Sequence, residues 1–126
     1  MDNLSTPLSR VKGLGSAKEG TTHFWRQRLT ALILIPLVLW FGFSVASMPV
    51  DHATLVGWIQ QPAVAIGLIL LILSTFYHAQ LGLQIIIEDY VSTHSTRTAS
   101  IIIVNFLCLL FAIIGVVAVL KISFGA

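Results

Sequence analysis

The stretch Ser74–Tyr90, STFYHAQLGLQIIIEDY, contains the one histidine that lies inside a long apolar segment, and it ends in two acids and a tyrosine. His78 and Asp89 are eleven residues apart. At about 100° per residue this is roughly 1100°, close to three whole turns, so both side chains share one face of a helix that runs this far. Their axial separation is roughly 16 Å, about half of a bilayer core. An ionisable group inside a membrane span is by default a candidate functional residue.

The composition indicates a membrane protein. Of 126 residues, 56% are hydrophobic and 10% are charged, whereas soluble domains carry about 25% charged residues. The net charge is only +2, and the sequence has no cluster of basic residues of the kind that binds nucleic acid, so no nucleic-acid partner is expected. The single cysteine, Cys108, cannot form a disulfide within the chain. It also cannot hold an iron–sulfur cluster alone, because such clusters usually need about four thiolates.

Three segments are apolar over enough residues to cross a membrane. We therefore predict an all-α integral membrane protein with three transmembrane helices, at about 29–50, 62–88 and 98–121. Pro36 lies inside the first segment and is expected to kink it. Pro62 suits the first turn of the second helix, where its missing N–H costs little.

The polar segment 1–22 is expected to be an N-terminal tail that precedes a membrane anchor domain over 23–126. Three spans would place the two termini on opposite sides of the membrane. Six Lys and Arg residues then fall on the side of the N-terminus and one on the other side: Arg10, Lys12, Lys18, Arg26, Arg28 and Arg97 against Lys121. The positive-inside rule therefore predicts a cytoplasmic tail. In a mitochondrion the equivalent side would be the matrix.

His78 has two interpretations. It can be a buried histidine that is satisfied by hydrogen bonds between helices. Alternatively, it is an axial haem ligand, because a neutral imidazole binds haem iron through Nε2 while Nδ1–H finds an acceptor, to which Ser74 could contribute. Gly82, one turn further on, would let a flat macrocycle lie against the helix. The other histidines lie outside the spans, so a second axial histidine would come from another chain.

The end of the second span also has two interpretations. Glu88-Asp89-Tyr90 can be an ordinary solvated helix end, or Tyr90 and Asp89 can belong to a quinone site. Quinone reduction requires electrons, protons and hydrogen-bond donors at two carbonyls, and a tyrosine hydroxyl and a proton-relaying carboxylate supply part of this chemistry. Arg26 and Arg28 either anchor the first helix among lipid phosphates or pair with haem propionates.

Two further functions fit the same residues. His78 could be a proton relay in a small helical transporter or channel subunit. Such proteins more often carry several membrane carboxylates or broken-helix repeats, and the sequence has neither. The chain could also be a structural anchor without haem.

The pattern His78-Ala79-x-x-Gly82 followed by Asp89-Tyr90-Val91 resembles the D-type hydrophobic membrane-anchor subunits of succinate dehydrogenase, the respiratory complex II. The segments Gly13–Gly20 and Arg28–Ala31 are also similar to bacterial members of this family. The resemblance implies a hetero-oligomeric helix bundle in the bacterial inner membrane or, alternatively, the mitochondrial inner membrane. It implies three partner chains: a flavoprotein subunit, an iron–sulfur subunit and a C-type cytochrome b anchor subunit.

The same resemblance assigns roles to four residues. His78 would be the axial iron ligand of a haem b shared with the C-type anchor. Tyr90 and Asp89 would bind ubiquinone, which is the electron acceptor and not a resident cofactor. Arg28, with Arg26 as the alternative, would lie near the haem propionates. The chain would take part in electron transfer from succinate to ubiquinone but would perform no succinate chemistry itself.

Overall fold

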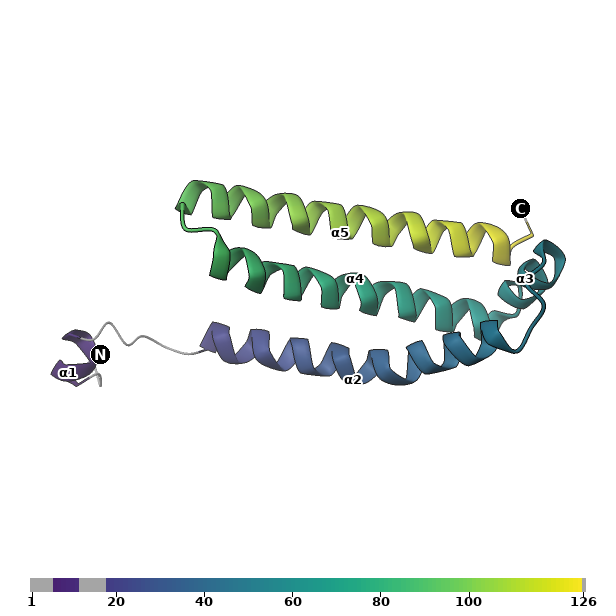
Figure 1. The fold of residues 1–126 in the computed structure, drawn as a ribbon, viewed down its shortest axis with the longest axis horizontal. Helices are drawn as coiled ribbons and strands as arrows, with labels where there is room; N and C mark the ends of the chain where they lie inside the picture. The colour runs from purple at the N-terminus through teal and green to yellow at the C-terminus, as the bar shows by residue number, and fades with distance from the viewer. Residues whose placement is uncertain (1–5, 12–17, 126) are drawn as a thin grey trace.

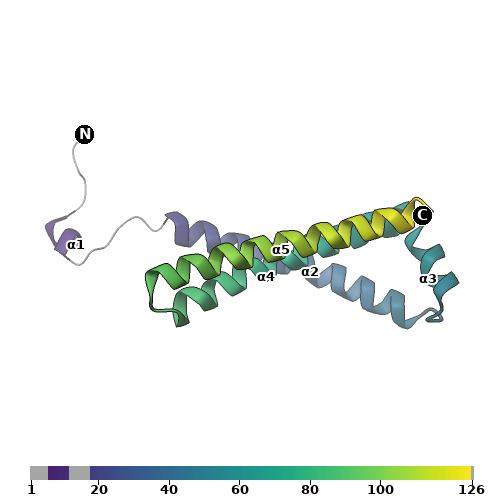
Figure 2. The same ribbon diagram turned by 90° about the horizontal axis from the view of Figure 1, so that it is seen from above.

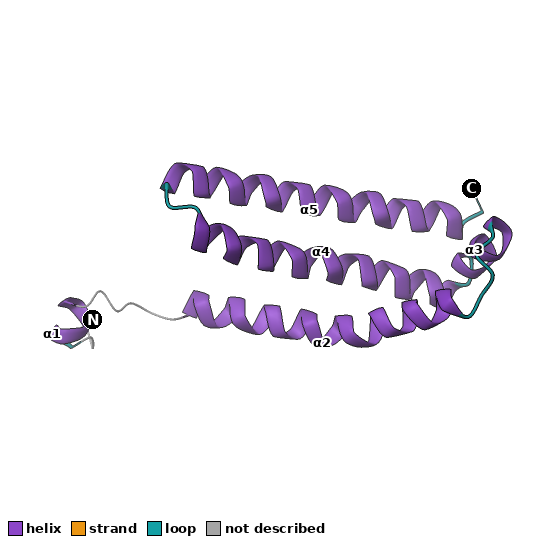
Figure 3. Cartoon of the chain, in the orientation of Figure 1, coloured by secondary structure: helices purple, strands orange, loops and turns teal. Residues whose placement is uncertain are grey.

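The computed structural model describes residues 6–11 and 18–125, and all regular secondary structure in these ranges is helical (Figures 1 and 3). The helices are α1 (Pro7–Val11), α2 (Lys18–Ala46), α3 (His52–Ile59), α4 (Pro62–Tyr90) and α5 (His94–Ser123). Three of them are long and apolar enough to cross a membrane, over Gly20–Ala46, Pro62–Tyr90 and His94–Ser123. The predicted all-α architecture with three spans is confirmed.

The helices and the predicted spans differ at their ends. α2 begins at Lys18, inside the segment 1–22 that was expected to be a tail, and it ends at Ala46 rather than near residue 50. α5 begins at His94, four residues before the predicted span, because Arg97 N–H donates to the Thr93 carbonyl (2.9 Å) and closes a polar first turn. A helix can thus continue through polar residues at the membrane surface. Lys12 and the side chains of Arg10 and Lys18, used in the charge argument, lie outside the described residues.

The connection between the first two spans contains a helix, α3, that the sequence analysis did not predict. Its N-cap is Asp51, whose carboxylate accepts hydrogen bonds from the Thr54 backbone N–H (2.9 Å) and hydroxyl (2.6 Å). This is a standard way to satisfy the free N–H groups at a helix start. The bond from the Thr54 hydroxyl, followed by the backbone bond, holds the pKa of Asp51 below its ordinary value of 3.8.

The three long helices form a row with α4 in the middle (Figure 1). α4 packs against both α2 and α5, while α2 and α5 do not approach each other closely. Seen from above, α2 diverges from α4 and α5 toward the α3 end, and α3 bridges the gap (Figure 2). A row leaves most apolar side chains exposed to lipid or partner helices. The buried apolar residues of the described chain are few: Val64, Ala65, Leu68, Leu81, Ala112 and Val119.

The best-packed region lies at the α3 end. Val64, Ala65, Leu68 and Val119 form a cluster against which aromatic and aliphatic side chains pack, among them Trp40, Trp58 and Ile72. The Trp40 and Trp58 rings lie 5.8 Å apart between centroids. Trp40 also lies directly over Gly67, where an added Cβ would come within 2.8 Å of its ring. Gly67 therefore has a packing role, since the absence of a Cβ leaves room for the Trp40 ring that reaches across from α2.

Two further features shape the row. Figure 1 shows α2 curved along its length while it stays continuous through Pro36, whose missing N–H leaves one helical bond unmade. Between α4 and α5, Gln80 Nε2 donates to Asn105 Oδ1 (2.9 Å), and the Phe76 and Phe111 rings stack with centroids 6.3 Å apart. Polar pairs of this kind join helices in a membrane at about 1 kcal/mol each.

Candidate functional site

The residues singled out in the sequence gather toward one end of the molecule. Figure 1 shows the start of α2, the end of α4 and the start of α5 at the same end, opposite α3. α4 is one continuous helix from Pro62 to Tyr90, so the condition under which His78 and Asp89 share a face is met. The site therefore has a deep part, around His78, and a rim, around Asp89 and Tyr90.

The deep part is a hydrogen bond between α2 and α4. Thr30 Oγ1 lies 2.9 Å from His78 Nδ1, and Thr30 is only 7% exposed. Thr30 is twelve residues from the start of α2, and His78 is twelve from the end of α4, so the two meet at the same depth. His78 itself is half-buried. The described residues supply a hydrogen-bond partner for its Nδ1 and none for its Nε2.

The neighbours expected for His78 from the sequence occupy other positions. Ser74 does not bond to the ring; it lines a 470 Å³ cavity together with Thr30, Arg26 and Tyr77. Gly82 faces α2, and a Cβ added there would lie 3.6 Å from Gln27 Nε2. The end of the Gln27 side chain is therefore in ordinary contact distance of this position.

The two arginines of α2 point to different sides. Arg26 lines the 470 Å³ cavity and also a 580 Å³ cavity between α2 and α4. Arg28 lies over the Phe24 ring, with Cζ 5.1 Å from the ring centroid. Two residues on a helix differ by about 200°, which accounts for the divergence. Arg26 is therefore the arginine on the His78 side of α2.

The 580 Å³ cavity combines groups of several kinds. It is lined by His23, Arg26, Gln84 and Glu88, among others. On α4, Gln84 Nε2 donates to Glu88 Oε1 (2.9 Å), one turn apart. On α2, two buried polar atoms in the described chain have no hydrogen-bond partner, His23 Nε2 and Gln27 Oε1. Unpaired buried polar atoms are uncommon in proteins, and they mark this helix contact as a place that further polar groups can complete.

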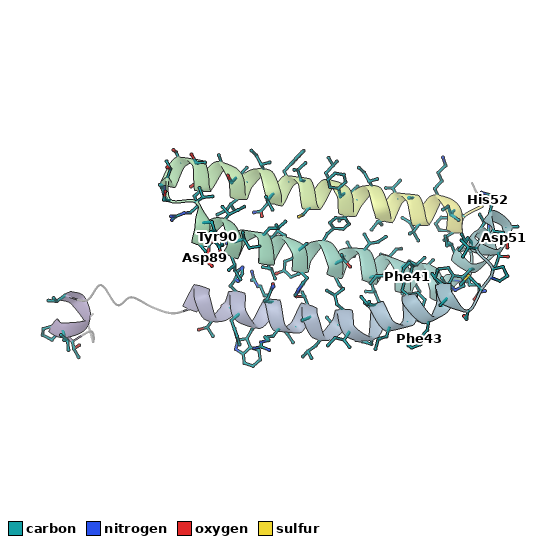
Figure 4. All side chains as sticks on the ribbon, viewed as in Figure 1. Phe41, Phe43, Asp51, His52, Asp89 and Tyr90 are labelled. Carbon is teal, nitrogen blue, oxygen red and sulfur yellow. The ribbon has the colours of Figure 1, made fainter. Side chains whose placement is uncertain are left out.

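The rim consists of the last two residues of α4. Asp89 and Tyr90 are exposed, Tyr90 to 84%, and Figure 4 shows both at the end of the helix. Within the described residues, neither side chain forms an ion pair or hydrogen bond. The loop that follows is held by Arg97, whose Nε donates to the Val91 carbonyl (2.8 Å). The backbone next to Tyr90 is thus ordered, while the hydroxyl stays free for another molecule.

Sequence analysis missed Thr30, His23 and Gln27. The three lie on one face of α2, at spacings of four and three residues, and all are polar residues next to or inside an apolar segment. That spacing was a usable signal, but the facing residues on α4 are more than 45 positions away in the chain. In the described ranges no group of three or more His, Cys, Asp or Glu side chains could hold a metal ion.

Comparison with known proteins gives consistent matches. Residues 2–114 match the sequence model of a family described as the succinate dehydrogenase/fumarate reductase transmembrane subunit. The chain is 36% identical over 113 residues to the succinate dehydrogenase hydrophobic membrane anchor subunit of Rickettsia bellii, covering 89% of this chain and 90% of that protein. It is 34% identical over 98 residues to the subunit of that name in Paracoccus denitrificans, covering 77% and 75%. A succinate dehydrogenase membrane anchor subunit of Reclinomonas americana is 32% identical over 98 residues, covering 73% and 80%.

Proposed function

This chain belongs to the succinate dehydrogenase/fumarate reductase transmembrane subunit family, and we propose that it anchors a succinate:quinone oxidoreductase to the bacterial inner membrane. Its partners would be a flavoprotein subunit, an iron–sulfur subunit and a C-type cytochrome b anchor subunit. Electrons from succinate would reach ubiquinone through the partners. The chain's own contribution would be a haem ligand and part of the quinone site.

The haem proposal is carried by the Thr30–His78 hydrogen bond. It engages Nδ1 of the ring and leaves Nε2 available, which is the arrangement that a neutral imidazole needs to ligate haem iron. When bound, haem b would supply a one-electron redox centre, with His78 as one of its axial ligands. A second axial histidine would come from the C-type anchor, because His52 and His94 are the first residues of α3 and α5, away from the depth of His78. His23 lies inside α2, contrary to the expectation that it is outside the spans, but it is seven residues before Thr30, which is the α2 residue at the depth of His78.

For the haem propionates, the helix geometry favours Arg26 over Arg28. The sequence resemblance pointed to Arg28, and that assignment stays a prediction. Arg26 lines the cavity that also contains Thr30, whereas Arg28 is engaged with Phe24. A guanidinium pairs well with a carboxylate through two parallel hydrogen bonds, so Arg26 has both the chemistry and the position for this role.

For the quinone, we propose Tyr90 as a hydrogen-bond donor to a carbonyl and Asp89 as a proton relay. Reduction to the quinol consumes two electrons and two protons, and the membrane surface supplies the protons from water. The exposure of Tyr90 and its lack of a partner in the described chain support a site that is completed by residues of the neighbouring subunits.

The proposed orientation places this site on the cytoplasmic side. Arg26, Arg28 and Arg97 all lie at that end, and positively charged residues are concentrated on the cytoplasmic side of membrane proteins. Cysteine labelling of intact cells with a membrane-impermeant reagent would test this. A cysteine added after Ala126 should react from outside, and one at Thr98 should not.

The experiment that tests the proposed function is a reduced-minus-oxidised visible spectrum of the purified complex, compared with that of His78→Ala. The wild type should show a b-type spectrum, and the variant should lose the low-spin form because one axial ligand is gone. His52→Ala, at the start of α3 on the opposite side of the membrane, is the matched control and should leave the spectrum unchanged. A wild-type complex without haem, or an unchanged low-spin spectrum in His78→Ala, would contradict the haem ligation.

A further inference from the structure

Building on the proposed function, we infer that Thr30 of α2 is a positioning residue for His78. Its hydroxyl accepts the Nδ1–H of the ring, and it thereby selects the tautomer and fixes the ring orientation in which Nε2 faces the haem iron. Thr30 would not touch the iron or the macrocycle. It would act through His78, and it would tune the reduction potential of the haem.

The direction of the hydrogen bond follows from the number of protons. Thr30 Oγ1 lies 2.9 Å from the Arg26 carbonyl and 2.9 Å from the Gln27 carbonyl, both of which can only accept. A threonine hydroxyl has a single proton and two lone pairs. When that proton points to either carbonyl, Oγ1 can only accept from His78. Nδ1 then carries the ring proton, and Nε2 has a lone pair to donate to a metal.

The opposite tautomer is disfavoured at this position. If Nδ1 were the acceptor, Thr30 would have to turn its proton away from both carbonyls, and Nε2 would carry a proton that blocks iron ligation. Thr30 is 7% exposed, so water cannot readily replace either contact. Its branched Cβ also restricts rotation of the side chain, so the acceptor stays in place. The α2–α4 contact thus prepares the ring before any ligand is present.

The expected consequence is electronic as well as geometric. An acceptor at Nδ1–H raises the basicity of the ligating nitrogen, which stabilises the ferric over the ferrous haem and lowers the reduction potential. Because Oγ1 itself donates to a carbonyl, its lone pair is a better acceptor than an isolated hydroxyl. Removing the hydroxyl should therefore move the potential in the positive direction. It should also broaden the low-spin ferric signal, because the ring can then adopt more than one orientation.

The test compares Thr30→Val with Thr30→Ser in the intact purified complex. Valine keeps the shape of threonine and removes only the hydroxyl, whereas serine keeps the hydroxyl. Redox titration of the visible haem bands and low-spin ferric electron paramagnetic resonance are the readouts. We expect a positive shift and a broadened signal in Thr30→Val, and values close to wild type in Thr30→Ser. Ser74→Ala, which removes a hydroxyl one turn before His78 on α4, should resemble wild type.

Two results would overturn the inference. The first is a Thr30→Val complex with an unchanged potential and signal. The second is an equal change in Thr30→Val and Thr30→Ser, which would indicate a packing effect without a role for the hydroxyl. If Thr30→Val does not assemble, Thr30→Ala removes the same hydroxyl with a smaller side chain, and the same comparison with Thr30→Ser applies.

The outcome separates this inference from the proposed function. A wild-type complex without haem would contradict the proposed ligation by His78, and the inference with it. Suppose instead that the wild type has low-spin haem, that His78→Ala loses it, and that Thr30→Val changes neither the potential nor the signal. This set of results would contradict only the role of Thr30. The spectrum and the reduction potential depend on the axial ligation of the haem iron, so neither measurement requires the enzyme to turn over.

Discussion

The two ends of the membrane-spanning row are built in different ways. At the α3 end, Trp40 lies over Gly67 and beside Trp58, and the apolar cluster around Leu68 is buried. At the other end, the contact between α2 and α4 includes polar groups as well as the buried Leu81. It contains the Thr30–His78 bond and two buried polar atoms, His23 Nε2 and Gln27 Oε1, that have no partner in the described chain.

This difference suggests that one end of the chain mainly contributes stability and the other end carries the candidate site. Close packing of rings and small residues stabilises helix contacts in a membrane, where the hydrophobic effect does not drive helices together. Polar groups in the same medium are costly unless they are paired, and those that remain unpaired in a single chain are suited to bind something else. The α3 end therefore holds the apolar cluster of the described chain, while the other end carries polar groups that we propose are completed by partners and ligands.

The largest expected effect on activity concerns the rim. Tyr90→Phe deletes one hydroxyl at an exposed position, so it should leave the stability of the complex unchanged. If the hydroxyl bonds to a quinone carbonyl, loss of about 1–1.4 kcal/mol should reduce ubiquinone reduction about five- to tenfold. Succinate oxidation with an artificial acceptor that takes electrons upstream should persist. Equal loss with both acceptors would instead indicate failed assembly, and normal quinone reduction would remove the proposed role.

The next effect concerns the packed end. Gly67→Ala would bring a Cβ to 2.8 Å from the Trp40 ring, so this ring must shift from its position beside Trp58. Overpacking of this kind costs about 1–3 kcal/mol. Heating of the purified complex should show a lower unfolding midpoint, with unchanged haem spectrum and quinone reduction in the complex that assembles.

Gly42→Ala is the matched control for this substitution. It is also a glycine-to-alanine change inside a long helix, but nothing lies within 4 Å of the added Cβ, so the midpoint should not fall. If Gly67→Ala changed the haem spectrum as strongly as the stability, the division between a packed end and a functional end would be wrong.

The smallest effect is expected at α3. The pKa of Asp51 is lowered because its charged form accepts the bonds from Thr54. Because the pKa is lower in the folded state, the cap stabilises α3 fully at pH values above the ordinary pKa of 3.8. This contribution is lost as the pH falls through the lowered pKa. Asp51→Asn keeps an acceptor but does not titrate. In the wild type, hydrogen exchange of the Thr54 amide, corrected for intrinsic exchange, should become faster as the pH falls and the cap is lost. In Asp51→Asn this acid-induced increase should be absent. An unchanged acid response in Asp51→Asn would argue against this cap.

Much of the fold was predictable from residues 23–126 because a bilayer imposes a simple length requirement. Uncharged apolar segments of more than 20 residues had to become spanning helices, and Pro62 indicated where one of them begins. α3 was not predicted, because its eight residues look like an ordinary connection and its only local signal is the Asp51 cap.

For the candidate site, the sequence by itself was enough to identify the histidine within a predicted span and the acid and tyrosine at the end of the same helix. It was also enough to place His78 and Asp89 on one face of α4, because the 3.6-residue periodicity of a helix is a local property. Only the tertiary structure decided that Thr30, 48 residues away, meets His78, and that Arg26 rather than Arg28 shares a cavity with Thr30. These contacts depend on the rotation and offset of α2 against α4. Close packing between the helices, such as that of Trp40 on Gly67, sets that offset, and no local pattern encodes it.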